Sequence, residues 1–214
     1  MLVDIHTHKK LQSANRMILN LEFTEAQVLF SSNEKGWFSL GFHPWYADEF
    51  SNEALVELAH WATDKRLVAI GECGLDKNSK IPMDEQIPVF EQQILLSERM
   101  KKPLIIHCVG CFNELFAIKK RIHPHQLWII HGFRGKPELA CQTLKAGCAL
   151  SFGVHFNPES VRITPINSLF VETGDSTVPI QDIYRQLSVI KQCEAEDLNA
   201  GDILFQSFAE QFIV

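Results

Sequence analysis

The stretch "PLIIHC", residues 103–108, decides the fold prediction for this chain. Its apolar residues follow one another without the polar alternation of a half-exposed strand, and "LWIIHGF" at residues 127–133 repeats the pattern. Continuous apolar runs of this kind are typical of strands that are covered on both faces, as in a parallel sheet. Pro103 agrees with this interpretation, because proline is tolerated at the first residue of a strand.

Similar runs recur along the chain, and most are followed by a segment with helical periodicity. About eight strands alternating with helices predict an α/β fold, a (β/α)8 TIM barrel. In 214 residues such a barrel is compact, and we expect it to be irregular over the first forty residues, which are too short for full βα units. An open doubly wound sheet is the alternative, although no glycine-rich phosphate loop follows the first strand. The expected strands are 2–6, 16–21 or 26–31, 37–41, 67–72, 103–107, 127–131, 148–152 and 168–172, and the expected helices are 52–63, 85–101, 112–121, 137–146, 179–192 and 195–211.

Composition and charge indicate one globular domain over residues 1–214, with two small domains as the alternative. The chain is 46% hydrophobic, enough for a large core, and its net charge of −6 argues against a protein that binds nucleic acid by positive charge alone. A nuclease stays possible, since bound metal ions bring their own positive charge. No signal peptide opens the chain, and no apolar run is long enough to span a bilayer. The six cysteines lack the spacing of a disulfide framework, which predicts thiols and a cytoplasmic protein.

Histidine and carboxylate residues stand at the C-terminal ends of five predicted strands. In a parallel barrel these ends meet at one face, where barrel active sites lie. Each residue alone could simply bond to the backbone, but burying all of them together is costly unless a cation organises them. Imidazole and carboxylate ligands suit zinc or manganese, whereas magnesium depends more on carboxylates, and the number of ligands favours two ions that share a carboxylate. The candidate ligands are His6, His8, Glu72, His107, His131 and Asp175.

The motifs "DIHTH", "GFHPW", "AIGECGLD", "PLIIHC", "IIHGFRG", "ALSFG" and "VETGDS" resemble, in this order, those of the TatD-type metal-dependent hydrolases. That family belongs to the amidohydrolase-like barrels, and several members are deoxyribonucleases. The resemblance implies that His6 and His8 hold one metal ion and that Glu72 bridges two. It further implies that His107 and His131 hold the second ion. The family's aspartate after strand eight would bind the first ion and accept a proton from the nucleophilic water.

The chain departs from the family pattern after the last strand. The family has Glu-Thr-Asp, whereas this chain has Glu172-Thr173-Gly174-Asp175, so that Gly174 occupies the aspartate position. A shift of one residue reverses side-chain direction in a regular strand, but glycine allows a bulge or a positive-φ turn that re-aims the next residue. We expect Asp175 to act as the ligand and proton acceptor. The alternative is a weakened site in which Glu172 or water compensates.

Further polar residues fall in or near these motifs. We expect His43 to face the substrate and Asp76 to accept a hydrogen bond from a ligand histidine. Arg134 either approaches a substrate phosphate or forms a surface salt bridge, and His155 either contacts a phosphate or lies in a surface loop. The remaining histidines, His60, His123 and His125, are expected to face solvent.

These features predict a metal-dependent hydrolase, foremost a deoxyribonuclease that cleaves phosphodiester bonds with a metal-activated water. Glu72 and Asp175 would be its catalytic groups, and two divalent ions (zinc, magnesium or manganese) its cofactors. We expect single-stranded DNA or a DNA end as the substrate, with no membrane and no obligate protein partner. One alternative is a hydrolase of a small amide, lactone or phosphoester, because the fold does not determine the substrate. The other, suggested by Gly174, is a catalytically weakened relative that binds a ligand.

Overall fold

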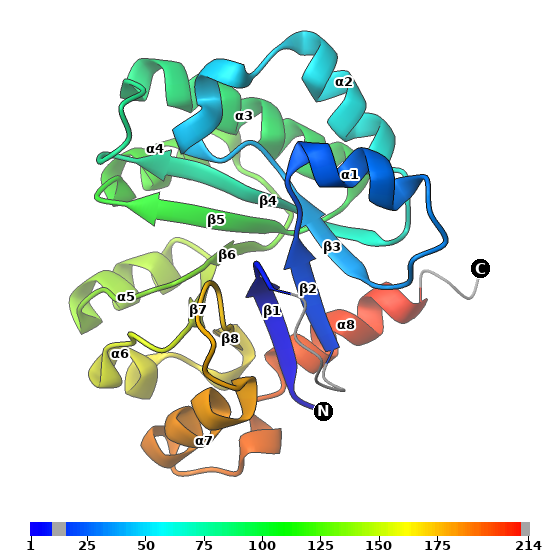
Figure 1. The fold of residues 1–214 in the computed structure, drawn as a ribbon. Helices are drawn as coiled ribbons and strands as arrows, with labels where there is room; N and C mark the ends of the chain where they lie inside the picture. Colours follow the sequence, from blue (N-terminus) through cyan, green and yellow to red (C-terminus); the bar gives the residue numbers. More distant parts are fainter. Residues whose placement is uncertain (10–15, 211–214) are drawn as a thin grey trace. The chain divides into compact units, whose positions relative to one another are not determined.

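In the computed structural model, which describes residues 1–9 and 16–210, eight strands follow one another in the sheet in sequence order (Figure 1). The pairs β1·β2, β3·β4, β4·β5 and β7·β8 are parallel. Helices alternate with the strands, so the topology is that of a (β/α)8 barrel, as predicted. The strands are β1 (Val3–Thr7), β2 (Arg16–Asn20), β3 (Trp37–Leu40), β4 (Leu67–Asp76), β5 (Leu104–Val109), β6 (Trp128–Ile130), β7 (Cys148–Phe152) and β8 (Leu169–Val171). The α-helices are α1 (Phe23–Phe30), α2 (Asn52–Trp61), α3 (Met83–Met100), α4 (Phe112–Ile122), α5 (Pro137–Lys145), α6 (Pro158–Ile163), α7 (Ile180–Lys191) and α8 (Ala200–Glu210), and the 3-10 helices are η1 (Pro44–Glu49), η2 (Ile166–Ser168) and η3 (Ala195–Asp197).

The chain groups into two compact units, of which the first contains the described residues up to Leu19 and from Ile129 onward. In this unit β1 pairs with β2, and Thr7 at its end forms a parallel bridge with Gly174 after β8. Helix α8, red in Figure 1, packs against β1 and β8. A Cβ atom at Gly201 would lie 3.0 Å from the Cβ of Val3, so the glycine permits the close approach of α8 to β1.

The second unit, Asn20–Trp128, contains the ladder of β3, β4 and β5 with α3 packed on β4. All ten residues of β4 are buried, as expected for a strand covered on both faces. Gly74 has φ of +136°, and a Cβ atom there would lie 2.1 Å from the carbonyl oxygen of His107. Glycine is therefore required where β4 approaches β5 at the end that carries the polar residues.

Most expected elements agree with the structure, including the strand at 16–21, and the main differences are these. The expectation of a strand at 26–31 is wrong, since those residues belong largely to α1, whose start is stabilised by a hydrogen bond from the Glu22 N–H to Glu25. Helix α6 was not expected, and the segment 195–211 contains η3 and then α8, with residue 211 outside the described part. Strand β4 continues beyond residue 72 because it pairs with β5 as far as Asp76.

Two expectations from composition concern thiols and membranes. The six cysteines are present as thiols, as their spacing predicted. Among the helices of the described residues, none combines the length and the apolar composition needed to cross a bilayer.

Candidate metal centre

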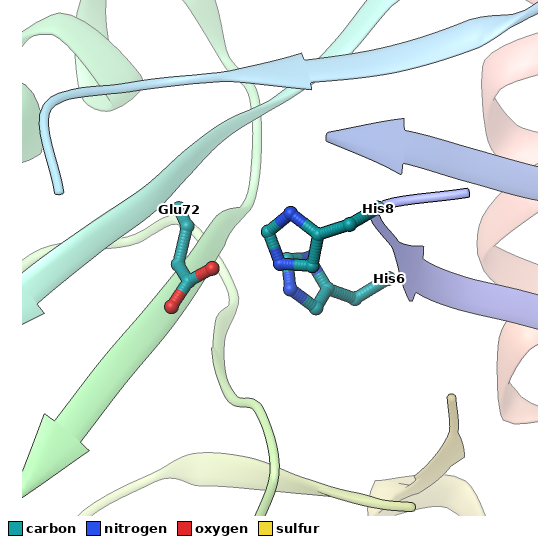
Figure 2. Close-up of side chains that lie close together, drawn as sticks. All are labelled: His6, His8 and Glu72. Carbon is teal, nitrogen blue, oxygen red and sulfur yellow. The ribbon is translucent and has the colours of Figure 1, made fainter. Parts of the chain in front are cut away.

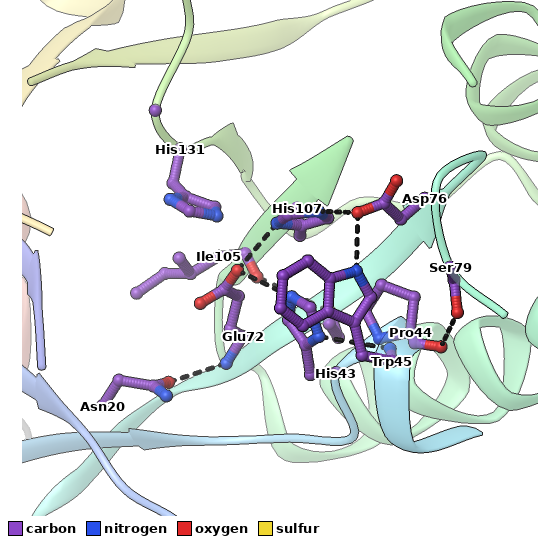
Figure 3. Close-up of polar contacts among 12 residues, drawn as sticks. Asn20, His43, Pro44, Trp45, Glu72, Asp76, Ser79, Ile105, His107 and His131 are labelled. Atoms are coloured by element: carbon purple, nitrogen blue, oxygen red, sulfur yellow. Dashed lines mark hydrogen bonds and ion pairs between the residues drawn. The ribbon is translucent and has the colours of Figure 1, made fainter. Parts of the chain in front are cut away.

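In the second unit, one carboxylate lies between two imidazoles (Figure 3). Glu72 Oε1 is 3.1 Å from His43 Nε2 and 2.9 Å from His107 Nδ1. Each of the three side chains offers a ligand atom, and these atoms all lie within 4.8 Å of one another. The register of β4 against β5 shifts between Ile70 and Cys73, and such an irregularity re-aims the residue inside it, here Glu72. Asn20 at the end of β2 accepts the backbone N–H of Glu72 at 2.8 Å and holds this segment in place.

His107 has a carboxylate oxygen at each of its ring nitrogens. Its Nδ1 faces Glu72 as above, and its Nε2 is 2.9 Å from Asp76 Oδ2. A neutral imidazole has only one N–H, so the other nitrogen would turn a lone pair toward a carboxylate. A cation between His107 and Glu72 would satisfy both groups, because Nδ1 and the carboxylate oxygen could each turn a lone pair toward it. The residues therefore fit a divalent metal ion at this place.

Asp76 is suited to orient His107, the role expected from the sequence. It also accepts hydrogen bonds from Trp45 Nε1 at 2.7 Å and from the Asn78 backbone N–H at 2.7 Å. Burial raises the pKa of Asp76, but these hydrogen bonds and the one with His107 outweigh burial and hold the pKa below its ordinary value. The ionised carboxylate can accept the Nε2–H of His107, which leaves Nδ1 available to a metal ion.

His43 differs from His107 in the state of its ring. Its Nδ1 accepts the backbone N–H of Trp45 at 3.2 Å, so in the neutral ring the proton resides on Nε2. That proton points to Glu72 Oε1. A protonated nitrogen cannot ligate a metal, and His43 is therefore a hydrogen-bond donor beside the carboxylate, in keeping with the expectation that it faces substrate.

Three histidines and one carboxylate come together in the first unit. The ring centroids of His6 and His8 are 4.8 Å apart, and Figure 2 shows both rings at the end of β1. The ring centroid of His6 is 4.4 Å from that of His131. Nδ1 of His131 lies 3.4 Å from Glu172 Oε1. Burial raises the pKa of Glu172, but His131 first, and then His6, outweigh it and lower the pKa. Glu172 is thus an anionic partner that can orient His131.

A buried network joins the ends of β1 and β8. Asp4 accepts the Thr173 backbone N–H at 3.0 Å and the Thr173 hydroxyl at 2.6 Å, and the Thr173 hydroxyl also lies 2.9 Å from that of Thr7. Burial raises the pKa of Asp4 to about 7, although the hydrogen bonds from Thr173 oppose the rise. Gly174 completes the join by donating its N–H to the carbonyl of His6 at 2.9 Å. These bonds hold the segment that carries Glu172 beside the histidines of β1.

The turn after β8 has the positive φ that its glycine allows. Gly174 has φ of +57°, and a Cβ atom there would lie 3.7 Å from Glu172 Oε1. Asp175 is exposed, and its backbone carbonyl accepts a hydrogen bond from Lys9 Nζ. In this unit the carboxylate next to the candidate ligand His131 is therefore that of Glu172, whereas the role of Asp175 stays a prediction.

Of the other residues singled out in the sequence, Arg134 and His155 are exposed, and neither lies in the hydrogen-bonded clusters described above. Two contributing residues were missed, namely Asn20 and Trp45. The tryptophan of "GFHPW" was visible in the motif, but its bond to a residue 31 positions away was not. The histidines expected to face solvent, His60, His123 and His125, are exposed.

A (β/α)8 topology whose strands carry clustered imidazoles and carboxylates is typical of the metal-dependent hydrolases of the barrel class. Comparison with known families identifies the family: the model of the TatD related DNases matches residues 4–193 of this chain. The chain belongs to this family, and the resemblance seen in the motifs is confirmed.

Individual relatives agree with the family assignment. The chain is 31% identical over 159 residues to a Bacillus subtilis protein named uncharacterized metal-dependent hydrolase YabD, covering 70% of this chain and 62% of that one. It is 34% identical over 138 residues to the 3'-5' ssDNA/RNA exonuclease TatD of Erwinia billingiae, covering 63% and 52%. The matches thus span between about half and three fifths of these relatives' length. The crystal structure of the TatD homologue YJJV from Escherichia coli has the same fold, with a TM-score of 0.80 and 20% identity over 97% of each chain.

Proposed function

We propose that this protein is a metal-dependent nuclease that hydrolyses phosphodiester bonds of single-stranded DNA or DNA ends. The observation that carries the proposal is the position of His107, whose Nε2 faces the carboxylate of Asp76 while its Nδ1 faces that of Glu72, an arrangement that suits a cation. The relative from Erwinia billingiae that is named an ssDNA/RNA exonuclease supports the substrate class. The proposal treats residues 1–214 as one hydrolase domain, and the six thiols support a cytoplasmic location.

The proposed cofactors are two divalent ions, with zinc, manganese and magnesium as candidates. Glu72 would be the carboxylate that the two ions share, and histidines would complete the ligand set. When bound, the ions would supply an activated water and neutralise charge on the phosphate. The ligand histidines are His6, His8, His107 and His131.

The chain's own residues would prepare the site for this chemistry. Asp76 and Glu172 would hold His107 and His131 in the ring orientation and tautomer that ligation needs. His43, whose Nε2–H points to Glu72 Oε1, would orient that carboxylate at the face where the substrate binds. Asp175 is the proposed proton acceptor, and Glu172, which is buried beside His131, is the alternative. Arg134 and His155, both exposed, would contact neighbouring phosphates.

Gly174 favours a second candidate function. A chain without the family's aspartate could bind nucleic acid or a small phosphoester and hydrolyse it poorly. Activity measurements separate this candidate from the first.

The test is cleavage of a short 5'-labelled single-stranded DNA by chelator-treated protein, with manganese, magnesium or zinc added singly. We expect metal-dependent shortening by the wild type and by the control His60→Ala, an exposed histidine on α2. His107→Ala and the double variant His6→Ala/His8→Ala should be inactive. Absence of cleavage with every metal would overturn the nuclease proposal, and bound but intact DNA would favour the second candidate.

A further inference from the structure

An exposed aromatic pair follows His43 in η1. The exposed fractions of Trp45 and Tyr46 are 54% and 48%. We propose that the indole of Trp45 is a stacking platform for the base of the nucleotide whose phosphate enters the candidate metal centre. The inference rests on the proposed nuclease function and narrows its substrate to strands that carry bases at this position.

The exposure of Trp45 is not explained by packing. It is the most exposed of the four tryptophans, whereas Trp128, for example, is fully buried. An indole is large and apolar, and leaving more than half of it in water forgoes the stabilisation that burial would give. Since its polar N–H is already bonded to Asp76, the part that remains exposed is the ring itself.

The position of the ring is fixed relative to the candidate ligands. The centroid of the Trp45 ring system is 5.2 Å from that of His43, with the planes at 89°, and 6.4 Å from that of His107, with the planes at 69°. Figure 3 shows the indole beside these two imidazoles, with its nitrogen directed to Asp76. The hydrogen bond restrains the side chain before any ligand binds, so stacking on it costs little further conformational entropy.

The chemistry of this neighbourhood matches a nucleotide. Glu72, His107 and the metal ion they fit offer a place for an anionic phosphate, and the indole next to them offers a flat apolar surface. In a nucleic acid strand a phosphate and a flat base are neighbours on one sugar. Stacking on an aromatic side chain accepts any base because every base has a π-face, which suits an enzyme that degrades strands of any sequence.

The same contact ties substrate binding to the metal ligands. Asp76 accepts hydrogen bonds from both Trp45 Nε1 and His107 Nε2 on one oxygen, Oδ2. A phenylalanine at position 45 would keep an aromatic face but lose the bond to Asp76, whereas alanine would lose both. Comparing the two variants therefore separates stacking from the orientation of Asp76.

The experiment measures binding of two labelled short single strands by fluorescence anisotropy with manganese present, and phosphorothioate linkages protect both strands from hydrolysis. One strand carries bases throughout, and the other has abasic tetrahydrofuran residues at its 3' end. We expect Trp45→Ala to weaken binding of the base-bearing strand by about 5- to 150-fold and to leave binding of the abasic strand nearly unchanged. Trp45→Phe should retain most of the affinity. The control Val56→Ala removes an exposed apolar side chain on α2 and should change neither.

Three outcomes would overturn the inference. If the wild type binds both strands with equal affinity, a contact with the bases is excluded. If Trp45→Ala lowers the affinity for both strands by the same factor, the role of Trp45 is structural. Absence of binding to either strand would exclude a nucleic-acid partner. Cleavage assays on the same strands with ordinary phosphodiester linkages distinguish the two proposals. If the protein cleaves both strands equally well, the stacking proposal is refuted and the nuclease proposal stands. If binding depends on the bases but no metal supports cleavage, the nuclease proposal is refuted and the stacking proposal stands.

Discussion

Replacing Asp76 by asparagine tests whether a carboxylate behind His107 prepares the metal centre. Asp76 accepts three hydrogen bonds, from His107 Nε2, from Trp45 Nε1 and from the Asn78 backbone N–H, and the three involve both of its oxygens. Asparagine has one oxygen and one NH2 group in the same place. Whichever way the amide turns, its NH2 group faces at least one donor, and the negative charge beside His107 is gone.

The expected loss follows from the role of the group. Removing the hydrogen-bond partner of a metal-ligating histidine typically lowers metal affinity about 10- to 100-fold, which corresponds to roughly 1.4–2.8 kcal/mol. The lost or mismatched hydrogen bonds should also lower the free energy of unfolding by about 0.5–1.5 kcal/mol each. The metal-free Asp76→Asn protein should therefore remain folded but melt at a lower temperature.

The assay is isothermal titration calorimetry of manganese or zinc into chelator-treated protein, with circular dichroism to confirm folding. Asp48→Asn is the matched control, since it removes the same charge from an exposed position on η1. We expect the control to bind metal like the wild type. If the folded Asp76→Asn protein binds metal as tightly as the wild type, the reasoning that Asp76 orients His107 is refuted.

Three further predictions concern other parts of the fold. Because Asp175 or Glu172 is proposed to serve already, Gly174→Asp should leave metal affinity and hydrolysis nearly unchanged, and it should cost about 1–2 kcal/mol of stability because an aspartate must adopt the left-handed φ of +57°. A sharp rise of metal affinity in calorimetry and of hydrolysis would instead favour the weakened site. Burial lowers the pKa of Lys102 from 10.5 to about 8, so between these pH values the unfolded chain binds more protons and the free energy of unfolding should rise with pH, by roughly 2–3 kcal/mol. Urea denaturation at pH values at both ends of this range should show the rise in the free energy of unfolding of the wild type. An equal rise in Lys102→Met would show that Lys102 does not cause it. Gly74→Ala should lower the free energy of unfolding by about 2–4 kcal/mol, because the new Cβ atom would lie 2.1 Å from the His107 carbonyl oxygen. A urea midpoint equal to that of the wild type would refute the close approach of β4 to β5.

Much of the fold and the residue types of the site could be predicted from the sequence. A strand buried on both faces must be apolar along its length, so runs such as residues 103–107 identify parallel strands without any knowledge of their neighbours. Such runs tolerate polar residues only at their ends. His107 and His131 stand at these ends, which predicts that they lie at the face of the barrel that carries the site. These features are local, because each depends on the burial of one short segment.

The local pattern failed where a short apolar run suits two structures. Residues 26–31 have a composition compatible with a strand, but the Glu22–Glu25 hydrogen bond begins a helix before them. In the same way, the length of β4 beyond Glu72 depends on its pairing with β5, which no property of residues 67–76 alone determines.

The sequence by itself therefore determined the strand-and-helix alternation, the family and the identity of the histidines proposed as ligands. Only the tertiary structure decided how the rings are used: that His107 is held by Asp76, that Trp45 bonds to the same carboxylate, and that Glu172 lies against His131. The physical reason is that hydrogen bonds between side chains depend on distances of a few ångströms between residues 31 to 41 positions apart, and the packing of whole strands sets those distances.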